Sequence, residues 1–336
     1  MKAPLWLPYL QSIVEEKNGF FTFVFNGGSE KVKLNNIQSI LIYGESDFDL
    51  PLDIINKICG HGVPIVIHRR NIPTPIYISQ GIRKDPDNTL EAQISTRTNK
   101  RKCTHIARQL LVVKMDSMKY LVSPIILPQY ANIEQLRYIE ASHAKKYWKV
   151  YFEKLGKPEW VRRPAKNIKK DNLAVVALDA VSKFLSGIQL RYIAYHHLSA
   201  QHGFLHTPTD YPALVYDSLE PYRGIFELEC LKVFKKVGFD NNNKNWVGLA
   251  IEAVKNKLND KTYVPLTRQI ATYQELLHGE IISLKYYCLG NQRKFHIPMP
   301  GKPNGGRPAK INFLLYGRHA GKTDFWKVAR EVSKDL

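Results

Sequence analysis

The sequence predicts an α+β protein with an N-terminal β-rich domain that carries one small helix, followed by a larger all-α domain. Short aromatic and β-branched runs bounded by Gly and Pro fill about the first eighty residues. A polar, turn-prone segment follows, and helical spacing of apolar residues dominates from Thr89 onward. A chain of 336 residues is long enough for two such domains.

The N-terminal elements can be placed from local patterns. Phe20–Phe25 is aromatic and β-branched and runs into Asn26-Gly27-Gly28, which predicts a strand and a hairpin turn. Residues 51–59 carry apolar side chains at helical spacing and stop before Gly60, which predicts the small helix. Further strands are predicted at Ile37–Tyr43, Val63–His68 and Ile76–Ser79.

The rest of the chain is predicted to be helical. Apolar stripes run from Ile106 to Met118 and from Tyr147 to Leu155, and Val175–Leu198 predicts a long helix buried at the centre of the domain. Two Lys-containing segments rich in Gly and Pro are predicted to be a basic loop and a flexible tail loop, at 154–170 and 297–308. We therefore expect a β domain at 1–82, a linker at 83–90 and a helical domain at 91–336.

The charge balance favours a polyanionic partner. Lys and Arg number 49 against 30 Asp and Glu, a formal charge of +19, and nucleic acid is the usual ligand of such a surface. A ribosomal or membrane-surface protein is the alternative. The loop at 154–170 has seven basic residues and one acid together with Trp160, which predicts contact with a phosphate backbone, whereas a solvated loop without a partner is the plain alternative.

The cysteines and the hydropathy of the chain narrow the possible classes of protein further. The four cysteines lie far apart without a Cys-x-x-Cys pair, which argues against a zinc ribbon or a redox dithiol. No signal peptide is recognisable, and no run reaches the roughly 18 uncharged apolar residues of a membrane span. We expect a cytoplasmic protein that does not enter a membrane.

One segment carries the clearest sign of chemistry. His206 lies on a Pro-containing turn, and an apolar stretch then carries Asp217 and Glu220. Residues three apart on a helix share a face, and adjacent carboxylates repel each other unless a cation lies between them. Such a set suits Mn²⁺ or Mg²⁺, and the imidazole favours Mn²⁺. The alternative is a surface hydrogen-bonding set. His196, His197 and His202 are interpreted as core or helix-end histidines rather than a second metal site.

The same segment resembles the signature of the CRISPR-associated integrase-endonuclease family, the Cas-one proteins of spacer acquisition. The matching positions are Gly203–His206, Leu214–Asp217, Glu220 and Arg223. Upstream, Ile139–Trp148 resembles the family's helix with a catalytic glutamate at Glu140. An Arg-Arg-Pro loop at 162–164 and the Gly-rich stretch at 54–66 extend the resemblance over about 37–280.

The resemblance implies that the helical domain is catalytic and carries out metal-dependent transesterification, in which the 3′-hydroxyl of a DNA end attacks a phosphodiester of the repeat array. The same site would hydrolyse branched DNA. By the resemblance, the catalytic residues are Glu140, His206, Asp217 and Glu220. Glu140, His206 and Glu220 would hold Mn²⁺ or Mg²⁺, and Asp217 would orient the site or a water ligand. The DNA phosphates would be contacted by Arg223, Arg162, Arg163, Lys166, Lys169 and Lys170.

The resemblance also implies partners. They are double-stranded DNA, as spacer precursor and CRISPR repeat, a second copy of the chain bound through the β domain, and the small ferredoxin-like second adaptation protein. Two alternatives stay open: a casposase-like transposon integrase, and a non-catalytic DNA-binding relative of the same fold.

Overall fold

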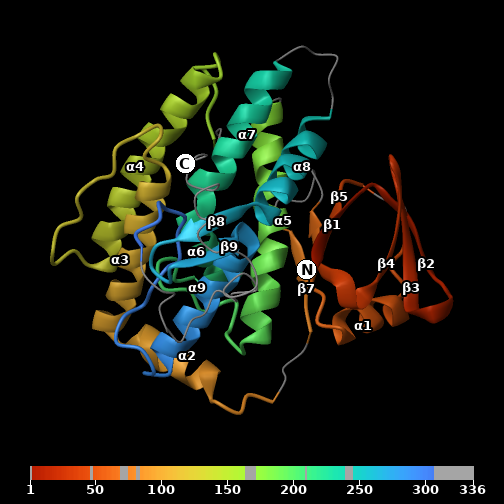
Figure 1. The fold of residues 1–336 in the computed structure, drawn as a ribbon, viewed down its shortest axis with the longest axis horizontal. Helices are drawn as coiled ribbons and strands as arrows, with labels where there is room; N and C mark the ends of the chain where they lie inside the picture. The colour runs from red at the N-terminus through yellow and green to blue at the C-terminus, as the bar shows by residue number, and fades with distance from the viewer. Residues whose placement is uncertain are drawn as a thin grey trace.

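The strands of the N-terminal part form two sheets. The computed structural model describes residues 2–45, 48–68, 75–80, 84–162, 172–208, 210–238 and 245–305. In that part of the chain the larger sheet has the order β1-β5-β6-β7, formed by β1 (Ala3–Pro8), β5 (Ile37–Tyr43), β6 (Ile65–His68) and β7 (Ile76–Ile78) (Figure 1). The smaller sheet is an antiparallel meander of β2 (Leu10–Glu15), β3 (Phe20–Phe25) and β4 (Gly28–Lys33). The short 3-10 helix η1 (Lys17–Gly19) connects β2 to β3, and η2 (Leu34–Asn36) connects β4 to β5.

The predicted N-terminal strands, hairpin and small helix are confirmed. In β3 the side chains of Phe21 and Phe23 are buried while their neighbours along the strand are not, as expected for a sheet with one covered face. Gly27 has a φ of +102°, which an L side chain adopts only with strain and which lets β3 turn directly into β4. Helix α1 (Leu52–Gly60) connects β5 to β6, and those two strands are parallel.

Strand β5 joins the two parts of the protein because both of its faces are covered. Ile40 lies in the core of the N-terminal domain, whereas Leu41 lies in the core of the helical domain. Helix α5 (Leu173–Tyr195) packs on that second face, between the sheet and most of the other helices (Figure 1). A Cβ on Gly187 of this helix would lie 3.2 Å from side-chain atoms of both Ser39 and Val66, so glycine permits the close approach.

The helical domain surrounds α5. Its other α-helices are α2 (Thr89–Thr98), α3 (Lys100–Ser117), α4 (Ile133–Lys154), α6 (Ala213–Leu219), α7 (Arg223–Val237), α8 (Trp246–Asn259) and α9 (Tyr273–Cys288). It also contains the 3-10 turn η3 (Glu220–Tyr222) and a hairpin of β8 (Lys261–Val264) and β9 (Gln269–Thr272). The hairpin was not predicted from the sequence, because each strand has only four residues and too little pattern to separate it from a helix end.

The start of α2 lies inside the predicted linker. Asp85 accepts hydrogen bonds from Thr89 Oγ1 (3.0 Å) and from the backbone N–H of Leu90 (3.1 Å). These bonds satisfy donors in the first turn, so the helix begins at Thr89 rather than after residue 90.

Helix α5 is the buried centre of the helical domain, as predicted. By length and hydropathy it would suffice to cross a membrane, but 72% of its most apolar window is buried against the rest of the protein. Burial of this kind is typical of a core helix.

The end of α3 fixes the position of η3 and of the start of α7. A Cβ on Gly224 would lie 2.2 Å from the backbone oxygen of Ser117, so only glycine allows this approach. The close contact brings Glu220 and Arg223 against the inner face of α3, where Lys114 lies.

Candidate active site

The turn that carries His206 is organised around Asp217. The Asp217 side chain is fully buried, and its two oxygens accept the backbone N–H groups of Phe204 (2.5 Å), Leu205 (2.9 Å) and His206 (3.0 Å). Oδ1 also lies 2.6 Å from Nδ1 of His206. Gly203 precedes the turn because a Cβ there would lie 2.8 Å from Asp217 Oδ2 and 2.5 Å from a backbone oxygen. Asp217 therefore fixes both the backbone of the turn and the orientation of the imidazole.

Two arginines hold the carbonyl side of the same turn. Arg97 of α2 donates to the backbone oxygens of Gly203 (2.9 Å) and Thr207 (2.5 Å). Arg137 of α4 donates to the backbone oxygen of Leu205 (2.7 Å) and to Thr207 Oγ1 (2.6 Å). With its N–H groups bound by Asp217 and its carbonyls bound by arginines, the turn is tied to three helices.

A buried lysine lies between the other two predicted carboxylates. Lys114 Nζ donates to Glu140 Oε1 and lies 2.5 Å from Glu220 Oε2. Arg223 Nη2 lies 3.3 Å from the second oxygen of Glu220. The side chains of Lys114 and Glu220 are each 3% exposed, whereas those of Glu140 and Arg223 are 22% and 26% exposed, so solvent reaches this cluster at Glu140 and Arg223.

The charges of the Lys114 cluster also act on His206. Burial alone would raise the pKa of Glu220, but the charges of Arg223 and Lys114 outweigh this effect and lower that pKa to about 2. His206 contributes to the same shift. In turn, burial alone would lower the pKa of His206, but the hydrogen bond to Asp217 and the charges of Asp217 and Glu220 raise it. The charges of His206 and Glu220 thus act on each other's pKa, while the direct contact of the imidazole is with Asp217.

The donor set suits a divalent cation. Among the described residues no three His, Cys, Asp or Glu side chains are grouped tightly enough to hold a metal ion, because Glu140 and Glu220 converge on Lys114 instead. Yet Glu140 and Glu220 bring carboxylate oxygens to one point, where the ammonium of Lys114 supplies a cation, and Asp217 engages only Nδ1 of His206. An imidazole whose one nitrogen is held by a carboxylate commonly binds a metal through the other. Glu140, His206 and Glu220 therefore fit such an ion.

The structure brings the predicted residues Glu140, Glu220 and Arg223 together around Lys114, and it holds His206 against Asp217. Asp217 lies in α6 and Glu220 begins η3, so the two carboxylates take different partners rather than flanking one cation.

The basic residues predicted to contact DNA are only partly described. Arg162 forms an ion pair with Asp179 (2.7 Å) and lies over the Trp148 ring at 5.3 Å, so this guanidinium has a structural role in the protein. Arg163, Lys166, Lys169 and Lys170 lie outside the described residues. Contact of these residues with DNA stays a prediction.

Sequence reasoning missed Lys114, Arg97 and Arg137. For Lys114 a signal exists. On α3 the residues buried around it are Cys103, Ile106, Ala107, Leu110, Leu111 and Met115, so the lysine stands on an apolar stripe. Lysine is rarely fully buried unless it is paired. Arg97 and Arg137 carry no such signal, since arginines on two separate helices do not indicate a common target.

His196 and His278 form a separate pair that joins α5 to α9. Their Nε2 atoms lie 2.8 Å apart, and Tyr192 stacks on His278 at 4.3 Å. Burial, together with the nearby charges of His278 and Lys285, lowers the pKa of His196 to about 3, and burial lowers that of His278 to about 4. The interpretation of His196 as a helix-end histidine in the protein interior agrees with this arrangement.

Acid is expected to destabilise the fold through this pair. An imidazole in the unfolded chain has a pKa of about 6.5. The stabilisation that comes from keeping both histidines neutral is therefore complete above that pH, and it is lost as the pH falls toward their pKa values in the folded protein. At pH 5 each histidine should lower the free energy of unfolding by up to about 2 kcal/mol relative to neutral pH. Urea unfolding at pH 7.5 and pH 5 should show a smaller pH effect in the double variant His196→Phe, His278→Phe than in the wild type. An equal pH effect in both would contradict the assignment.

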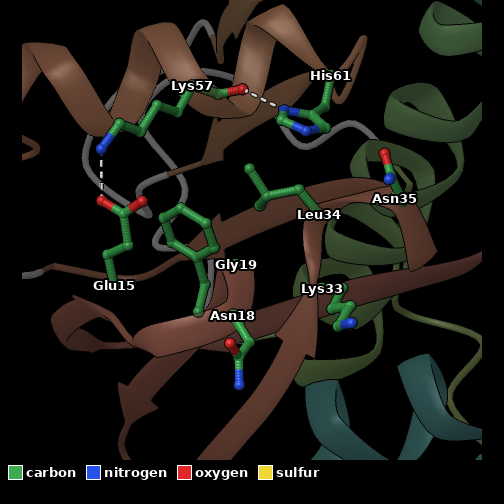
Figure 2. A pocket seen from close by; sticks show the side chains of 9 residues that line it. Glu15, Asn18, Gly19, Lys33, Leu34, Asn35, Lys57 and His61 are labelled. Carbon is green, nitrogen blue, oxygen red and sulfur yellow. Dashed lines mark hydrogen bonds and ion pairs between the residues drawn. The ribbon is translucent and has the colours of Figure 1, made fainter.

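A pocket of about 300 Å³ lies away from these residues, in the N-terminal domain beside α1 (Figure 2). Three of its lining side chains are already engaged: Lys57 Nζ lies 2.5 Å from Glu15 Oε2, and His61 Nδ1 lies 2.9 Å from the backbone oxygen of Lys57. No predicted site residue lines this pocket, so the candidate active site stays with the cluster around Lys114 and His206.

Comparisons with known proteins identify a family by sequence and show a shared fold by structure. The family model described as CRISPR associated protein Cas1 matches residues 10–256. No curated protein sequence matches the chain. A solved Cas1 protein from Thermotoga maritima is similar at a TM-score of 0.70 and 16% identity, over 88% of this chain and 99% of that one. A casposase bound to integration product has a TM-score of 0.69 and 16% identity, over 99% and 98%. A Cas6-RT-Cas1–Cas2 complex has a TM-score of 0.67 and 13% identity, over 88% of this chain and 36% of that one.

Proposed function

Because this chain belongs to the Cas1 family of CRISPR-associated proteins, we propose that it is a CRISPR adaptation integrase that inserts short DNA spacers into a repeat array. The observation that supports this most strongly is the meeting of Glu140 and Glu220 at the buried Lys114, with the charge of Glu220 also acting on the Asp217-held His206. The reaction is attack of a DNA 3′-hydroxyl on a phosphodiester. A free end and a new junction are formed, and with water as the attacking group the same site hydrolyses branched DNA.

Each residue of the site has a separate proposed role. Glu140, His206 and Glu220 would hold a divalent ion, Mn²⁺ or Mg²⁺, which would supply Lewis-acid polarisation of the phosphodiester and stabilise its developing charge. Asp217 keeps the proton of His206 on Nδ1, so that Nε2 can act as a ligand. Arg223 has a side chain that is 26% exposed next to Glu220, which suits contact with a phosphate oxygen.

The proposed partners are double-stranded DNA, a second copy of the chain and the small Cas2-type protein. The formal charge of +19 supports binding to DNA. The likeness to the Cas1 part of a complex with Cas2 supports the small partner. We place homodimerisation in the N-terminal domain at 1–82 and the chemistry in the helical domain at 91–336.

A casposase-like transposon integrase is the second candidate, and the likeness to a casposase over 99% of this chain favours it. The two candidates differ in their dependence on the small partner. A CRISPR integrase is expected to need that partner for accurate insertion at the repeat, whereas a casposase-like enzyme acts without it. The third candidate, a non-catalytic relative, conflicts with the charged cluster described above.

A plasmid-integration assay tests the proposal. The protein is incubated with a short duplex and a plasmid that carries the repeat, with Mn²⁺, with Mg²⁺ or with EDTA, each with and without the small partner. Joined products are expected only with a divalent metal. Joining that is unchanged in EDTA would exclude the metal-dependent mechanism. The absence of joining under every condition, while the DNA is bound, would favour the non-catalytic relative.

A further inference from the structure

We propose that Lys114 is a built-in cation of the active site, whose ammonium holds Glu140 and Glu220 together and which a divalent ion must displace in order to bind. This inference rests on the proposed function, because it takes these two carboxylates as metal ligands. It assigns to Lys114 a positioning role rather than a direct part in the reaction.

The position of Lys114 supports the inference. Its side chain is 3% exposed and rises from the buried stripe of α3, where an unpaired ammonium would be strongly disfavoured. Its Nζ atom contacts one oxygen of Glu140 and lies 2.5 Å from one oxygen of Glu220. An ion that bridged these two carboxylates would take the place that the ammonium now fills.

The partners of Glu220 lead to the same conclusion. One oxygen of Glu220 faces Lys114 and the other faces Arg223, and of these two cations Lys114 is the one that also contacts Glu140. Arg223 is also held by the charge of Glu227. Lysine has a flexible four-carbon stem, so its ammonium can move aside when an ion takes its place. Lys114, rather than Arg223, therefore moves away from Glu220 when a divalent ion binds.

The charges explain what this arrangement achieves. Without a cation, two carboxylates held together in a buried site would repel each other and destabilise the fold. Lys114 supplies that cation permanently, so the ligand set is assembled before a metal arrives. The consequence is competition, because part of the metal's binding free energy is spent on displacing the ammonium.

The substitution Lys114→Met tests the exchange, because methionine keeps the length of the side chain and removes its charge. Calorimetric titration with Mn²⁺ alone should give a Kd lower by about tenfold or more than in the wild type, since a like charge beside the site is removed. Without metal the variant should have a lower Tm, and Mn²⁺ should raise its Tm by more than that of the wild type. Lys119→Met, at an exposed lysine just beyond α3, is the matched control and should leave the Kd unchanged.

Lys114→Arg provides the second variant, because it keeps the charge and should retain weak Mn²⁺ binding. If Lys114→Met folds only in the presence of Mn²⁺, the exchange is supported. A Kd in Lys114→Met equal to or higher than that of the wild type, or no Mn²⁺ binding by either protein, would overturn it.

These measurements use no DNA, so they separate the two proposals. An unchanged Kd in Lys114→Met together with metal-dependent integration by the wild type would exclude the exchange and leave the proposed function standing. If Lys114→Met binds Mn²⁺ more tightly while the wild type shows no integration, the result supports the exchange and counts against the integrase function.

Discussion

His206→Ala is expected to abolish strand transfer while binding of duplex DNA survives. The substitution removes the only neutral ligand proposed for the metal and leaves the basic surface of the protein intact. The rate of joining should fall by at least about a hundredfold, which is the scale seen when one electrostatic stabiliser of a transition state is removed. The measurement is plasmid integration in Mn²⁺, with DNA binding followed by mobility shift.

The control is a histidine outside the site. His61 lies at the end of α1 in the N-terminal domain and is exposed, so His61→Ala should retain both activities. Glu140→Ala should reproduce the loss caused by His206→Ala, because both residues belong to the proposed ligand set. Full integration by His206→Ala in Mn²⁺ would refute the site assignment.

Much of the fold could be predicted because its signals are local. The run Phe20–Phe25 and the turn after it lie within a few residues of each other, and the periodicity of α5 is contained in one segment. The helical spacing was predicted to begin at Thr89, where α2 begins, although the predicted linker ran on to residue 90; the bonds from Asp85 that begin the helix leave no hydrophobic pattern. The β8–β9 hairpin was missed because its strands are short and their burial depends on contacts with distant helices.

The site could be predicted only in part. The spacing of His206, Asp217 and Glu220 marks a motif, and the resemblance supplied Glu140, which lies far away in the sequence. Neither could give the division of roles between the two later carboxylates, because that depends on which way η3 turns after α6. The contacts of Lys114 with Glu140 and of Arg97 with the His206 turn join separate helices, and such contacts are not visible in one sequence.

Asp217→Ala is expected to lower stability and integration together. Three backbone N–H groups of the turn would lose their acceptor at a buried position, and each unsatisfied group costs about 1–3 kcal/mol. The free energy of unfolding should therefore fall by about 3 kcal/mol or more, and integration should be lost because the imidazole is no longer held. Urea unfolding and the plasmid assay measure the two effects.

The control for this variant is Asp116→Ala, since Asp116 is exposed and forms only a surface ion pair with Lys119 (3.1 Å). Its stability should change by no more than about 0.5 kcal/mol. Asp217→Asn keeps one acceptor oxygen and should lie between the wild type and Asp217→Ala in stability. A variant Asp217→Ala that unfolds like the wild type but fails to integrate would mean that this carboxylate acts on the metal or the DNA. That result would contradict the proposed role of Asp217 in holding the turn, because its bonds to the three backbone N–H groups require stability and activity to fall together.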